Sequence, residues 1–172
     1  MASLMENLIE VLELESKEYE ELLQLSQKKT PIIVKGDLAS LQSITDEEQD
    51  LVSRINNLDK KRVEVTADIA NVLNKDVATL KLNNLVDMLE ARPAEQQVLA
   101  KAHDRLQTVV HNLQQVNEHN RELLKNALEM VEFEMNIIQA SKKAPETANY
   151  NRGAYNAGDT IGVNSRGFDA KQ

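Results

Sequence analysis

The chain lacks several residue types on which whole classes of protein depend. Its 172 residues include no cysteine, which excludes a disulfide framework, a thiolate metal site and a cysteine nucleophile. Aromatic residues are limited to three Tyr and two Phe, with no Trp, so a β-sandwich or β-barrel is disfavoured. With five Gly, three Pro and 41% hydrophobic residues, the composition instead indicates a soluble helical protein.

Negative charge is in excess, with 28 Asp and Glu against 20 Lys and Arg and a formal net charge of -8. We therefore expect no nucleic-acid partner, because phosphate backbones are bound by Lys and Arg. No run of about 18 apolar residues occurs, so we expect no membrane insertion. The first residues lack a basic stretch followed by a continuous apolar one, which argues against a signal peptide and favours a cytoplasmic protein.

Apolar residues recur at steps of three and four along four segments, which is the period of a helix. The expected helices span about 4–35, 37–73, 77–91 and 94–141. The last would be about 70 Å long, and a helix of that length needs lateral burial to be stable. We therefore predict an all-α fold, an elongated antiparallel bundle of long helices with one shorter helix, over residues 1–144.

Local signals place the helix ends. Ser3 and Glu6 have the spacing of a capping box at the start of the first helix. Pro31 predicts either a kink or a bent but continuous helix. Gly36 and Asp37 mark a clearer break, because Gly can end one helix and Asp can cap the next.

Polar residues interrupt the apolar stripes at four positions. Glu48 and Arg62 stand where leucine is expected, so either both side chains extend to the margin of the stripe or they form interhelical charge pairs. Asn117 and Asn120 lie on or beside the seam of the last helix. We favour a role in fixing helix register, with recognition of a partner as the alternative.

Residues 123–138 carry two adjacent apolar stripes, more than one bundle face needs. A second stripe implies a partner, and methionines would suit an adaptable surface. The alternative is burial within a homodimer. The stripes are Leu123, Ala127 and Met130, and beside them Leu124, Leu128, Val131, Met135 and Ile138.

No group of residues in the sequence has the spacing of a catalytic, phosphate-binding or metal-binding site. His103, His111 and His119 recur every eight residues, about 12 Å apart along a helix, so no two of them share a metal ion within that helix. Gly-rich phosphate loops are absent, and nothing places a nucleophile beside a base. We expect neither an enzyme nor a bound cofactor or metal.

Residues 145–172 show no helical period and contain four of the five glycines, which predicts a flexible C-terminal tail. Apolar residues are nevertheless spaced along it, as in a segment that docks onto something. They are Tyr150, Tyr155, Ile161, Val163 and Phe168.

Three segments together resemble the FlgN family of flagellar export chaperones. They are KGDLASLQSITDEEQDLVSRINNLDKKR (35–62), VNEHNRELLKNALEMVE (116–132) and YNAGDTIGVNSRG (155–167). The resemblance extends from about residue 4 to 168. It implies a small cytosolic protein without catalysis that binds the C-terminal regions of the hook–filament junction proteins. Such a chaperone keeps its clients soluble and unpolymerised and delivers them to the export apparatus.

The resemblance also implies residue roles. Tyr155, or Tyr150, would contact the cytosolic domain of the export gate, and the gate's ATPase complex is a further candidate partner. A structural coiled-coil homo-oligomer or scaffold without a client is the alternative. For the chaperone itself, a further candidate partner is a second copy of the chain, in a homodimer when no client is bound. The residues expected to contact the client are Leu123, Leu124, Leu128, Val131, Met135 and Ile138.

Overall fold

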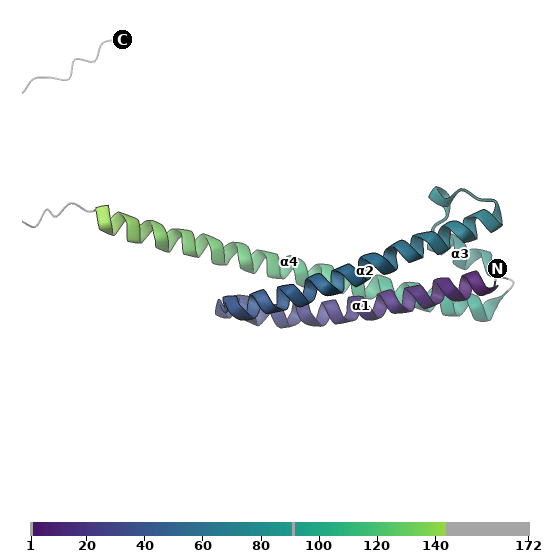
Figure 1. Ribbon diagram of the computed structural model, residues 1–172, viewed down its shortest axis with the longest axis horizontal. Helices are drawn as coiled ribbons and strands as arrows, with labels where there is room; N and C mark the ends of the chain where they lie inside the picture. Colours follow the sequence, from purple (N-terminus) through teal and green to yellow (C-terminus); the bar gives the residue numbers. More distant parts are fainter. Residues whose placement is uncertain (1, 91, 144–172) are drawn as a thin grey trace, which may run out of the picture. The chain divides into compact units, whose positions relative to one another are not determined.

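The computed structural model describes residues 2–90 and 92–143, and these residues form helices and no strand. The prediction of an all-α fold is confirmed. Within these residues, no helix has the length and apolar character that crossing a bilayer requires. The elements are α1 (Ala2–Lys35), α2 (Leu38–Leu73), the 3-10 helix η1 (Val77–Thr79), α3 (Leu82–Met88) and α4 (Pro93–Lys143) (Figure 1).

The chain forms two compact units, one ending at Glu132 and one beginning at Phe133. The first contains α1, α2, η1, α3 and most of α4. The second contains the last residues of α4, and the predicted tail at 145–172 lies outside the described residues.

A tight turn joins α1 and α2 into an antiparallel hairpin (Figure 1). Gly36 has a φ of 68°, in the left-handed region that glycine adopts without steric cost. The carboxylate of Asp37 accepts a hydrogen bond from the backbone N–H of Ser40 at 3.1 Å, which caps α2. The Gly-Asp break predicted from sequence is therefore the hairpin turn.

The sequence predicts a capping box at the start of α1 and a kink or a bend at Pro31, and the structure differs from the first of these. The capping box at Ser3 and Glu6 is wrong, because the helix already begins at Ala2 and Ser3 lies inside its first turn. Pro31 stands inside the helix without ending it. A proline removes one backbone donor, but α1 continues for four more residues beyond Pro31.

The helix predicted at 77–91 is wrong in its first part. The carboxylate of Asp76 caps η1 rather than an α-helix. Leu80 then has ψ of 88° and breaks the helical path. Its side chain is buried in the same cluster as Leu85 and Leu89. Burial of one such side chain contributes about 1.5–3 kcal/mol, enough to outweigh the local helical preference.

The core of the first unit contains two apolar clusters. The second is smaller and contains Leu22, Leu51, Ile55 and Leu113. All four α-helices of the unit contribute to the first, which contains Met5, Leu8, Leu12, Val65, Ile69, Ala70, Leu80, Leu85, Leu89, Leu99 and Ala102.

Burial along α4 ends well before the helix does. Its last fully buried residue is Asn120, and every described residue after Leu124 is exposed. The predicted burial of the stripe formed by Leu123, Ala127 and Met130 is therefore wrong beyond Leu124, since Ala127 and Met130 are exposed. The reason is length: α4 has 51 residues and α1 has 34, a difference of roughly 25 Å.

Candidate partner-binding site

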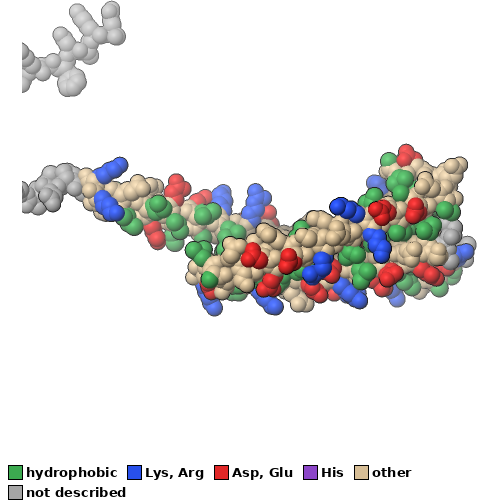
Figure 2. Space-filling model, in the orientation of Figure 1, with side chains coloured by type: hydrophobic (Ala, Val, Ile, Leu, Met, Phe, Trp, Pro, Cys, Tyr) green, Lys and Arg blue, Asp and Glu red, His purple; other side chains and the backbone are tan. Residues whose placement is uncertain are grey.

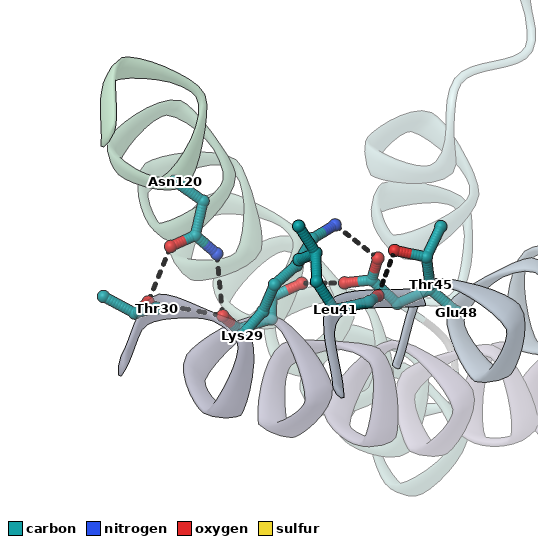
Figure 3. Close-up of polar contacts among 7 residues, drawn as sticks. Lys29, Thr30, Leu41, Thr45, Glu48 and Asn120 are labelled. Carbon is teal, nitrogen blue, oxygen red and sulfur yellow. Dashed lines mark hydrogen bonds and ion pairs between the residues drawn. The ribbon is translucent and has the colours of Figure 1, made fainter. Parts of the chain in front are cut away.

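A buried polar contact ties α4 to α1 where the burial of α4 ends. Asn120 is 3% exposed. Its Nδ2 donates to the backbone carbonyl of Ser26 at 2.7 Å, and its Oδ1 accepts from the hydroxyl of Thr30 at 2.6 Å (Figure 3). Asn117, its predicted companion, is exposed. The two hydrogen bonds link α4 to α1 at this level.

A second polar contact joins the two helices of the hairpin beside Asn120. The ammonium of Lys29 lies 2.6 Å from Glu48 Oε2, and the hydroxyl of Ser26 donates to Glu48 Oε1 at 3.2 Å (Figure 3). Both charged side chains are largely buried, at 19% and 13% exposure. Of the two sequence interpretations of Glu48, the interhelical charge pair is therefore the one observed.

Arg62 forms the corresponding pair further along the hairpin. Its Nε lies 3.1 Å from the carboxylate of Glu15, whose side chain is 2% exposed, and its guanidinium also contacts Asp59. Burial raises the pKa of Glu15, and the nearby charge of Arg62 lowers it less than burial raises it. Glu15 Oε2 has no hydrogen-bond partner within the described part of the chain.

An open groove of about 640 Å³ lies between the hairpin and α4. Its apolar lining comes from Leu22 and Val52 on one side and Leu124 and Leu128 on the other. Lys29, Glu48 and Asn120 form its polar part. The remaining lining residues are Ser26, Asn117, Arg121, Lys125, Glu129 and Glu132.

The structure distributes the predicted client-contacting residues unevenly. Leu123 and Leu124 are half-buried; Leu124 lines the groove, as Leu128 does, and Leu123 does not. Leu128 and Val131 are exposed, by 68% and 52%. In the second unit, Met135 and Ile138 are exposed as well.

Several exposed apolar residues were not assigned to the site from sequence. Val52 is 42% exposed. The sequence feature that could have identified it is an apolar residue directly after Leu51, which is a buried position of the stripe. Met130, which the sequence places on the stripe facing the bundle, is exposed. Phe133 and Ile137 are also exposed, and neither is among the residues predicted to contact the client. Figure 2 shows hydrophobic side chains along the exposed part of α4, interleaved with charged ones.

Other predicted site residues fall outside this groove. Tyr150 and Tyr155 lie beyond the residues that the structure describes. His111 and His119 are exposed on α4, and His103 contacts Asp104 at 3.4 Å. In residues 2–90 and 92–143, no three His, Asp or Glu side chains are grouped to hold a metal ion.

Comparisons with known proteins identify one family and one relative. The FlgN protein family matches residues 1–157. One relative, the uncharacterized protein YvyG of Bacillus subtilis (strain 168), is 25% identical over 135 residues, covering 77% of this chain and 76% of the relative. No solved structure matches the chain. Because the family match spans most of the sequence, including both walls of the groove, the chain belongs to the FlgN protein family.

Proposed function

We propose that the chain is a cytoplasmic flagellar export chaperone without catalytic activity. It binds the C-terminal regions of the hook–filament junction proteins, keeps them soluble and unpolymerised, and delivers them to the export gate. Membership of the FlgN family supports the class of function. Tyr150 and Tyr155 remain the proposed contacts with the gate.

One observation supports client binding above the others: α4 continues from Lys125 to Lys143 with every residue exposed. A helix gains most of its stability in water from burial of an apolar face. Large exposed apolar residues on such a helix indicate a surface for a partner. They are Leu128, Met130 and Val131 in the first unit, and Phe133, Met135, Ile137 and Ile138 in the second.

The chemistry of this surface favours an amphipathic helix as the client. Apolar side chains on a helix at these spacings pack against a second helix of the same pattern. Two of the seven are methionines, which adapt their shape to different partners. A client segment that folds on binding loses conformational entropy, which limits affinity and permits release at the export apparatus.

The test is calorimetry with a synthetic peptide that reproduces the C-terminal segment of a junction protein from the same genome. We expect a complex near one-to-one with a negative heat-capacity change. Leu128→Glu combined with Val131→Glu should abolish the heat, because each carboxylate would be buried against the client without a partner. Circular dichroism should still report a helical protein, since both side chains are exposed.

A matched control adds the same two charges elsewhere. Val63 and Val72 are exposed by 54% and 57% on α2, and Val63→Glu with Val72→Glu should leave the peptide affinity unchanged. Equal affinities of the two double variants would place the client away from α4. A tight homodimer of the wild type that takes up no peptide would favour a scaffold instead.

A further inference from the structure

One face of α4 carries opposite charges on either side of an exposed leucine. Lys125, Leu128 and Glu132 all line the groove, so they share a face of the helix. Lys125 and Glu132 are seven residues apart, about 10 Å along the axis, and Leu128 lies midway between them. Its side chain is 68% exposed.

This arrangement is self-complementary. If a second copy of the helix lies antiparallel, with a two-fold axis between Leu128 and Val131, its Glu132 lies near Lys125 and its Lys125 lies near Glu132. Two equivalent ion pairs form, as the symmetry of such an interface requires. The central layers would pair Leu128 with Val131 of the second copy, and both residues are more than half exposed.

A parallel arrangement lacks this match. It would place Lys125 beside Lys125 and Glu132 beside Glu132 of the second copy, and like charges at such positions are destabilising. Within the described residues, the ion-pair contact of Lys125 is a 4.0 Å approach to Glu129 with both side chains mostly exposed. A contact of that kind contributes little and leaves Lys125 free to pair across an interface.

We propose that the free protein forms an antiparallel homodimer through residues 124–132 of α4, with Leu128 and Val131 at its centre and reciprocal Lys125–Glu132 ion pairs at its margins. The groove beside Val52 gives the second helix a place to lie. The dimer covers the same apolar residues as the proposed client site. Resting on that proposed function, the client and the second copy exclude one another.

The dimer itself is tested by sedimentation velocity across a concentration series, without any client. The wild type should show a reversible monomer–dimer equilibrium. Lys125→Glu should raise the dimer dissociation constant about tenfold or more, because it creates two like-charge contacts. Adding Glu132→Lys to that variant should restore the dissociation constant to about the wild-type value, since the reversed pair is again self-complementary.

The matched control is Lys101→Glu, an exposed position of α4 outside the groove. It changes the net charge of the protein by the same amount and should leave the dissociation constant unchanged. A wild type that stays monomeric, equal effects of the two single variants, or failure of the double variant to restore the dimer would each overturn the proposal.

Adding the junction-protein peptide separates this proposal from the proposed function. We expect the mass of the dimer to fall to that of a one-to-one complex as the peptide saturates. A dimer that keeps both copies at saturation would overturn the shared surface. Peptide binding by a protein that never dimerises would overturn only the dimer, and a dimer that binds no peptide would overturn only the chaperone.

Discussion

The Asn120 side chain forms two of the shortest contacts between α1 and α4, to Ser26 and Thr30. Asn120→Ala removes two hydrogen bonds from a largely buried site, so the free energy of unfolding should fall by about 1–3 kcal/mol. The exposed Asn117 on the same helix is the control, and Asn117→Ala should change it by less than about 0.5 kcal/mol. Urea denaturation of both variants measures the difference. Equal effects would show that the buried contact contributes no stability.

The titration of Glu15 makes the stability of the protein depend on pH. Its pKa is raised by burial in the folded protein, so the native state holds this proton more tightly than the unfolded chain does. The contribution of Glu15 to stability is therefore most favourable below its unfolded pKa. It declines as the pH rises from there through the folded pKa.

Glu15→Gln removes this titration while keeping the size of the side chain. The free energy of unfolding of the variant, minus that of the wild type, should increase as the pH rises from the unfolded pKa of Glu15 through its raised folded pKa. Taking the difference cancels the carboxylates that titrate equally in both proteins. Denaturation at several pH values measures it, and a difference that is constant with pH would contradict the proposed role of burial.

The helices that period alone could predict are those with long, regular apolar stripes. Helix α2 was placed within a residue of its observed ends because Asp37 and Asn74 supply local capping signals. The sequence does not predict the path of the segment after Asn74 correctly. Leu80 is buried there through tertiary contacts, and the local sequence does not contain those contacts. Likewise, the stripe positions of Glu48 and Arg62 were visible, but their partners Lys29 and Glu15 depend on the alignment of α1 against α2.

For the candidate site at the end of α4, too, the sequence pattern does not show which element covers a helix face. Its apolar pattern continues unchanged past Leu124, whereas the hairpin that covers it does not. Periodicity identifies which side chains share a face but not which element, or which molecule, covers that face. The excess of apolar positions over residues 123–138 was therefore predictable, and the contribution of Val52 on the facing hairpin was not.

Over residues 2–90 and 92–143, the protein combines a buried core with a helix end that is exposed. Leu8 and Ile69 are fully buried in the first cluster, while residues 125–143 are all exposed. Amides held by few buried contacts open locally, at a lower free energy than global unfolding. Hydrogen exchange in the wild type should therefore be faster at residues 125–143 than in the cores of α1 and α2.

The junction-protein peptide and the protein concentration should both change the hydrogen-exchange rate of this part of α4. The junction-protein peptide should slow exchange at residues 125–143, because binding favours the closed helix by mass action. Raising the protein concentration without peptide should slow exchange at residues 124–132 if the homodimer forms. The Leu128→Glu, Val131→Glu variant should show neither effect, since it loses the surface that both occupants need. Protection that appears only on the hairpin, or equally in this variant, would mean that α4 is not where the client binds.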